Sequence, residues 1–120
     1  MKPYSLVIHG GAGTILKSDM TPELENAYIN GLEESLNDGY KLLEKGGTAV
    51  DVVRAAITAL ENNVLFNAGR GSVFTKKGVQ EMDAAIMSGS DLAAGAVTGV
   101  RNVMNPIELA YEVMTNSNHV

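Results

Sequence analysis

The sequence predicts a mixed α+β fold in which helices pack beside a sheet. Two long segments repeat apolar residues at helical spacing behind clear N-terminal caps, and the glycine- and alanine-rich segment 94–100 has the composition of a tightly buried strand. With 120 residues, of which 45 % are hydrophobic, the chain is long enough to bury one small core. We therefore expect one domain with both helices and strands.

The first predicted helix begins at Pro22, directly after Thr21, and ends at Gly46-Gly47. Thr21 is a favoured N-cap residue, and proline is favoured at the first helical position because its missing N–H is not needed there. Gly31 and Gly39 lie inside this segment. They either weaken the helix or mark a face that packs closely against a neighbour.

Two further helices follow the same logic. A helix over 49–60 is expected after the N-cap Thr48, since its apolar residues form one face. A third helix is expected after the N-cap Asn105, with Pro106 first and Glu108 at the capping-box position.

The strand predictions rest on short apolar runs bounded by turn residues. Residues 5–8 are expected to form a buried strand that ends at the glycine loop 10–13. Residues 72–75 and 79–87 are expected to pair as a β-hairpin around Lys76-Lys77-Gly78. Residues 94–100 are expected to form a further strand.

Composition excludes several classes of function. The formal net charge is -5 and no cluster of Lys or Arg is present, so nucleic-acid binding is disfavoured. The chain has no cysteine, which removes disulfides and thiolate chemistry. No apolar run approaches the roughly 18 residues of a membrane span, and the apolar stretch before His9 is too short for a signal-peptide core. We expect a cytoplasmic protein that does not bind membranes.

The segment His9-Gly10-Gly11-Ala12-Gly13 is the first candidate for chemistry. Glycines allow the backbone to approach a ligand closely. The spacing fits neither the dinucleotide fingerprint nor the phosphate-binding loop of nucleotide hydrolases, so nucleotide binding is a weak third possibility. The structural alternative is a tight strand exit with His9 satisfied in the core.

The second candidate is the segment Leu65 to Phe74, which overlaps the irregular loop 62–71 and contains Asn67 between apolar residues and glycines. The Asn67 amide could hold a carbonyl oxygen or a neighbouring loop, or it could only satisfy its own turn. Main-chain carbonyls of such a loop could also bind a hard cation.

The third candidate is the pair Glu81 and Asp83, which would share one face of a strand. Paired carboxylates would suit a glycosidase or a metal site. An exposed strand face, or a structural hydrogen-bond role for Asp83, is the commoner explanation. No nucleophile, base and oxyanion site can be assembled from the remaining residues.

Taken together, these segments resemble the plant-type (type III) L-asparaginases and isoaspartyl peptidases. The resemblance is carried by 9–13, by 60–71, by Glu81 to Met87, and by 94–100 with Asn105-Pro106, in the same order and at compatible spacing. That family belongs to the N-terminal nucleophile hydrolases and has a four-layer αββα sandwich. The resemblance implies that residues 1–120 are the N-terminal portion of the α subunit, a single partial domain.

The resemblance also implies a reaction and a partner. The precursor cleaves itself before a threonine, which becomes the nucleophile of a companion β subunit and hydrolyses the side-chain amide of L-asparagine or β-aspartyl dipeptides. The αβ units are expected to form a homodimer. No organic cofactor is implied, and the nucleophile is expected beyond residue 120, so this chain alone is expected to be inactive. A non-catalytic binding module built on the same fold is the alternative.

Residue by residue, Asn67 matches an asparagine beside the nucleophile, and Gly10 and Gly11 match a glycine loop near the active site. The resemblance further implies a structural sodium ion held by main-chain carbonyls. By position these belong to Leu60, Glu61, Asn63, Phe66, Ala68 and Arg70.

Overall fold

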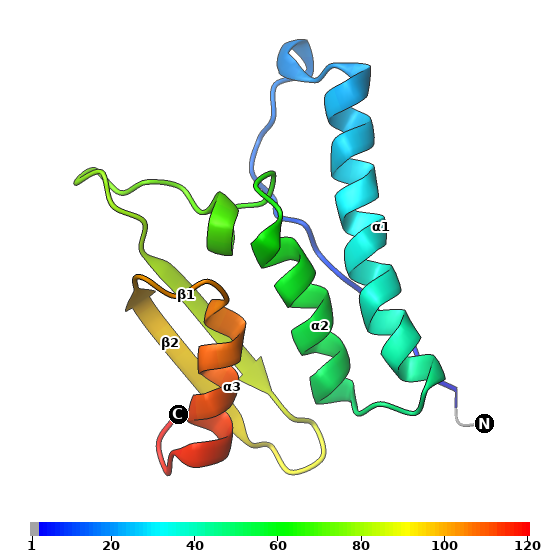
Figure 1. The fold of residues 1–120 in the computed structure, drawn as a ribbon, viewed down its shortest axis with the longest axis vertical. Coiled ribbons are helices and arrows are strands. Elements are labelled where there is room, and N and C mark those ends of the chain that lie inside the picture. The colour runs from blue at the N-terminus through cyan, green and yellow to red at the C-terminus, as the bar shows by residue number, and fades with distance from the viewer. Residues whose placement is uncertain (1–2) are drawn as a thin grey trace.

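The computed structural model describes residues 3–120 and contains three α-helices and one two-stranded antiparallel sheet (Figure 1). This confirms the mixed α+β prediction, while the four-layer αββα sandwich stays a prediction. The elements are η1 (Lys17–Asp19), α1 (Pro22–Glu44), α2 (Ala49–Asn62), η2 (Gly69–Gly71), β1 (Met82–Met87), β2 (Ala94–Val100) and α3 (Pro106–Asn116), of which η1 and η2 are single 3-10 turns.

Helix α1 packs against α2 along a face of small residues. The hydroxyl of Ser35, which is fully buried, donates a hydrogen bond of 2.8 Å to the Ala56 carbonyl of α2. A Cβ atom at Gly39 would lie 2.7 Å from Leu6 Cδ2 and 3.3 Å from Val52 Cγ1. The glycines of α1 therefore mark close packing, which offsets their cost in helix propensity.

Helix α3 covers one face of the hairpin formed by β1 and β2. Ile86, Ile107 and Ala110 are the buried centre of this contact. A Cβ atom at Gly95 would collide with the Ala110 carbonyl group, so the backbones of α3 and β2 approach directly. The predicted small-residue strand over 94–100 is thus confirmed, together with the reason for its composition.

The elements form a thin body of 45 × 40 × 19 Å. In Figure 1, α2 lies between α1 on one side and the α3–hairpin unit on the other. The extended N-terminal segment runs along the α1–α2 pair, where Leu6 lies against Gly39 of α1 and Gly10 lies against Leu32 of α1 and Phe66. Helix α2 is therefore the central element through which both halves are connected.

The prediction of a strand over 5–8 is wrong. These residues are extended, and Leu6 and Ile8 are partly buried while Val7 is 88 % exposed. Within residues 3–120 the only sheet is the β1–β2 pair, so no strand lies beside this segment to complete a ladder. Strand formation depends on such a partner, whereas the alternating burial comes from packing on the helices.

The predicted hairpin between 72–75 and 79–87 is also wrong, apart from one bridge between Phe74 and Gln80. Strand β1 pairs instead with β2, from Met82 opposite Val100 to Met87 opposite Ala94. Val73 and Phe74 are 64 % and 70 % exposed, so a ladder at 72–75 would gain little from packing.

Within residues 3–120, no helix combines the length and the apolar character needed to cross a membrane.

Candidate active site

The glycine loop and the Asn67 segment line one cavity of about 530 Å³. The structure thus brings together Gly10, Gly11 and Asn67, which the sequence had singled out separately. Helices α1 and α2 contribute the apolar part of the wall through Tyr28, Ile57 and Leu60. The remaining lining residues are His9, Ala12, Gly13, Thr14, Ile15, Leu65, Phe66 and Ala68.

Phe66 joins the walls of this cavity. Its side chain is buried, and its ring meets the Tyr28 ring edge-on at a centroid distance of 5.8 Å. A Cβ atom at Gly10 would lie 3.2 Å from Phe66 Cε1, and one at Gly31 would lie 2.9 Å from Phe66 Cε2. The ring therefore occupies space that two glycines leave free, and this places Asn67 beside residues 9–13.

The expectation that His9 lies in the core is wrong, because its side chain is exposed. Alternation along the extended segment turns Leu6 and Ile8 inward, so His9 points outward. Its Nδ1 atom accepts a hydrogen bond of 3.1 Å from the Gly11 N–H group. Gly11 has φ +116°, a conformation that strongly favours glycine, and a Cβ atom there would meet no neighbour.

Asn67 is exposed at the cavity. Its Oδ1 atom accepts a hydrogen bond of 3.0 Å from the Val73 N–H group, which confirms that the side chain satisfies its own loop. This bond leaves the amide nitrogen of Asn67 free for another acceptor. One side chain can therefore both hold the loop and donate a hydrogen bond toward the cavity.

The loop after α2 is closed by two glycines that pack on main-chain carbonyls. A Cβ atom at Gly69 would lie 2.5 Å from the Glu61 carbonyl oxygen, and one at Gly71 would lie 2.7 Å from that of Val64 and closer still to that of Phe66. Gly69 also has φ +49°. This stretch was predicted to be irregular. It contains the 3-10 turn η2, at the end of which the Ser72 N–H group donates to the Gly69 carbonyl.

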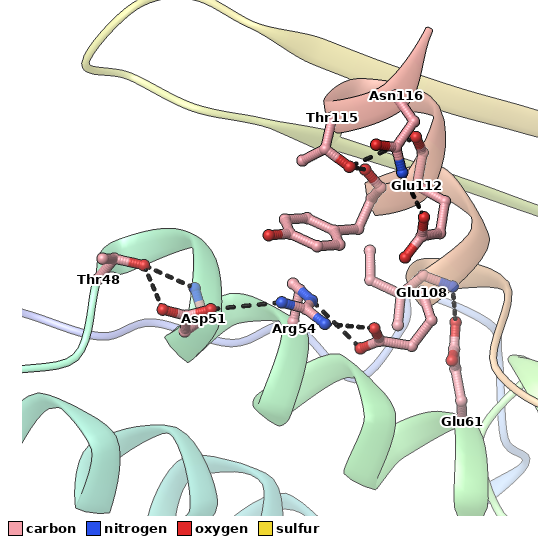
Figure 2. Close-up of polar contacts among 10 residues, drawn as sticks. Thr48, Asp51, Arg54, Glu61, Glu108, Glu112, Thr115 and Asn116 are labelled. Carbon is pink, nitrogen blue, oxygen red and sulfur yellow. Dashed lines mark hydrogen bonds and ion pairs between the residues drawn. The ribbon is translucent and has the colours of Figure 1, made fainter.

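The N-terminus of α3 is capped by a residue of α2, as Figure 2 shows. Glu61 Oε1 accepts a hydrogen bond of 3.0 Å from the Ile107 N–H group. The predicted N-cap Asn105 makes no side-chain bond to the helix and instead donates to Asn62 Oδ1. The helix begins at Pro106 with Asn105 at the N-cap position, as predicted, but the expected side-chain capping bond is wrong, because the Asn105 side chain bonds Asn62 and Glu61 supplies the cap.

Glu108 is not a capping-box residue either. Its carboxylate pairs with Arg54 of α2, whose Nε lies 3.3 Å from Glu108 Oε1 (Figure 2). The guanidinium also lies 3.6 Å from the centre of the Tyr111 ring and bonds Asp51. The hydrogen bond with Glu108 raises the pKa of Arg54 further. This cluster is a second link between α2 and α3.

Glu81 and Asp83 do not form a paired site. Glu81 pairs with Arg101, which follows β2. Asp83 Oδ1 accepts bonds from the Thr98 hydroxyl at 2.7 Å and from the Gly99 N–H group at 2.8 Å. The structural hydrogen-bond role expected for Asp83 is confirmed, and both carboxylates are used within the hairpin region.

Within residues 3–120, no three His, Cys, Asp or Glu side chains converge as a metal site would require. A cation here would thus depend on main-chain oxygens. The sequence interpretation missed Phe66 as the anchor of the cavity and Glu61 as the cap of α3. A glycine in mid-helix, Gly31, was the available signal for the first, and nothing local signalled the second.

Replacing Asp83 by Asn should reduce the loss of unfolding free energy on acidification. The bonds from Thr98 and Gly99 lower the pKa of Asp83 below its ordinary value of 3.8. The folded state therefore gains stability from the ionised carboxylate above pH 3.8, and loses it as the pH falls through the lowered pKa. Urea unfolding between pH 2 and pH 7 measures this; equal losses on acidification in both proteins would contradict it.

Comparison with known proteins places the chain in a family. The sequence model of the asparaginase family matches residues 1–120. A Dictyostelium discoideum protein, provisionally named isoaspartyl peptidase/L-asparaginase, is 52 % identical over 98 % of this chain and 34 % of its own length. An isoaspartyl peptidase of Salmonella typhimurium is 48 % identical over 100 % of the chain and 38 % of its own length.

A plant-type L-asparaginase of Pyrococcus furiosus is 48 % identical over 97 % of this chain and 36 % of its own length. The chain thus spans about a third of the length of these relatives. Because the family model matches the whole chain, the chain belongs to the asparaginase family.

Proposed function

We propose that residues 1–120 are the N-terminal portion of a threonine-dependent enzyme that hydrolyses the side-chain amide of L-asparagine or the β-aspartyl bond of dipeptides. The names of the relatives support the reaction class. The observation that carries the proposal is the cavity in which Asn67 meets the glycine loop. Both are segments by which the sequence resembles the family.

The geometry suits amide hydrolysis in a specific way. Gly10 and Gly11 line the cavity, where the Gly11 N–H group already donates to His9 Nδ1, whereas the Asn67 amide nitrogen makes no hydrogen bond within residues 3–120. Neutral donors of this kind stabilise the negative charge that develops on a carbonyl oxygen during attack. The glycine loop therefore serves as a wall of the site, and the Asn67 amide nitrogen serves as its hydrogen-bond donor.

The nucleophile is proposed to come from a companion segment that begins with threonine after autoproteolysis. The α-amino group of such a residue has a pKa of about 8, so it can act as the base for its own hydroxyl near neutral pH. Pairs of processed αβ units are proposed to assemble as a homodimer in the cytoplasm.

Intact mass under denaturing conditions, combined with asparagine hydrolysis, tests the proposal on the protein from its complete coding sequence. We expect two polypeptides, one beginning with threonine, and release of ammonia from asparagine or of aspartate from β-aspartyl dipeptides. A polypeptide of residues 1–120 alone should release neither. A single uncleaved chain without hydrolysis would contradict the proposal and favour a non-catalytic module.

Substituting Asn67 by Asp separates the two roles of this side chain. The aspartate keeps an oxygen that accepts from Val73 N–H but has no amide nitrogen to donate. We expect kcat/KM to fall by about 100-fold, the usual effect of removing one such donor, while the thermal midpoint stays within a few degrees. Unchanged kcat/KM would remove Asn67 from the reaction, and Asn67→Ala serves as the variant that loses both roles.

We also propose a sodium ion at the loop after α2, held by the carbonyls of Leu60, Glu61, Asn63, Phe66, Ala68 and Arg70. The carbonyl oxygens of Glu61 and Phe66 lie close to Gly69 and Gly71 in this loop, which supports the proposal, since hard cations prefer oxygen ligands. Several of these carbonyls already accept one main-chain hydrogen bond, including those of Leu60 and Ala68, and a carbonyl has a second lone pair. The ion would neutralise the clustered carbonyl dipoles and stiffen the loop.

Replacement of sodium chloride by choline chloride at equal ionic strength tests this site. Choline is too large for a carbonyl cage, so the thermal midpoint should be lower without sodium and should rise with sodium concentration. Equal midpoints in the two salts would contradict the sodium site without affecting the proposed reaction.

A further inference from the structure

The side chain of Glu61 lies at the junction of α2 and α3 and has no role in the proposed reaction or sodium site. It is the penultimate residue of α2, its side chain is 3 % exposed, and its Oε1 atom caps α3 through the Ile107 N–H group (Figure 2). Within residues 3–120 its other oxygen, Oε2, is buried without a hydrogen-bond partner. A buried carboxyl group with an unpaired oxygen is costly, so its position needs a compensating contact.

The capping bond satisfies the Ile107 N–H group, for which no nearer side chain provides an acceptor. Pro106, the first residue of α3, has no N–H, so Ile107 carries the first free amide of the helix. The adjacent Asn105 side chain is turned toward Asn62 of α2. The last turn of α2 thus supplies the acceptor for the first free amide of α3 and the partner of the Asn105 side chain.

Glu61 also packs against the loop that carries Asn67. The main chain of Glu61 lies against Gly69, where a Cβ atom would come within 2.5 Å of the Glu61 carbonyl oxygen and 2.6 Å of Glu61 Cβ. Gly69 lies two residues after Asn67, and its carbonyl accepts a bond of 2.8 Å from the Ser72 hydroxyl. The side chain of Glu61 therefore contacts the α3–hairpin unit, and its main chain contacts the loop that carries Asn67.

We propose that Glu61 is a positioning residue for the candidate site: its carboxyl group caps α3 and thereby keeps the α3–hairpin unit seated against the loop that carries Asn67. This rests on the proposed function for its catalytic consequence, but the mechanical coupling stands on the contacts alone. The required feature is an acceptor atom at the reach of Oε1. Glutamine supplies that acceptor, whereas alanine does not.

Hydrogen exchange followed by mass spectrometry on the full-length protein tests the coupling in Glu61→Ala and Glu61→Gln. In Glu61→Ala we expect exchange to accelerate about five- to tenfold in peptides covering 105–112 and, in parallel, 67–74, since one helix cap is lost. Glu61→Gln should restore both peptides to near the wild-type rate. If Glu61→Ala does not fold, Glu61→Asp, whose acceptor falls short by one methylene group, should give the same pattern more weakly.

Two controls make the outcome decisive. Glu112→Gln changes an exposed carboxylate of α3 and should leave 67–74 unchanged, and the peptide around Thr48, which caps α2, should exchange normally in every variant. Acceleration confined to 105–112, or failure of glutamine to restore it, would overturn the proposal. In the active enzyme, kcat/KM should fall with the alanine variant and recover with glutamine; absence of hydrolysis in wild type would count against the reaction, not against the coupling.

Discussion

The packing of the Phe66 ring is the contact on which the candidate site depends. The ring fills space left by Gly10 on the N-terminal segment and by Gly31 on α1, and it stacks edge-on against Tyr28. Interiors are close-packed, so a bulkier residue at either glycine would move the ring or the backbone. Because Asn67 follows Phe66 directly, the ring sets where the amide meets the glycine loop.

The C-terminal end of α2 links the cavity loop to α3 and, through α3, to the hairpin. Glu61 caps α3. Arg54, which precedes Glu61 on α2, pairs with Glu108 of α3. The hairpin packs against α3, whose backbone meets Gly95 directly, and Val50 and Ile57 of α2 pack against the same apolar cluster. Helix α2 therefore transmits the position of the cavity loop to the sheet, and the two links between α2 and α3 are polar and directional rather than purely apolar.

The sequence predicted those features that depend on local chemistry. Helices after Thr21 and Thr48 begin where expected because each cap bonds an amide only three residues away. The strand over 5–8 and the hairpin at 72–75 failed because strand pairing depends on partners distant in sequence. In the candidate site, Asn67 and the glycine loop were identified from their composition, whereas the role of Glu61 involves an amide 46 residues away and leaves no local pattern.

The most direct test of the central constraint is a double-mutant cycle between Gly31 and Phe66, measured by urea unfolding. Alone, Gly31→Ala should destabilise the protein despite the better helix propensity of alanine, because its Cβ atom would lie 2.6 Å from Asn63 Nδ2 and 2.9 Å from the Phe66 ring. In the Phe66→Ala background only the contact with the Asn63 side chain remains, so the same change should destabilise the protein less, by a coupling energy of about 1 kcal/mol or more. An equal effect of Gly31→Ala in both backgrounds would contradict the account.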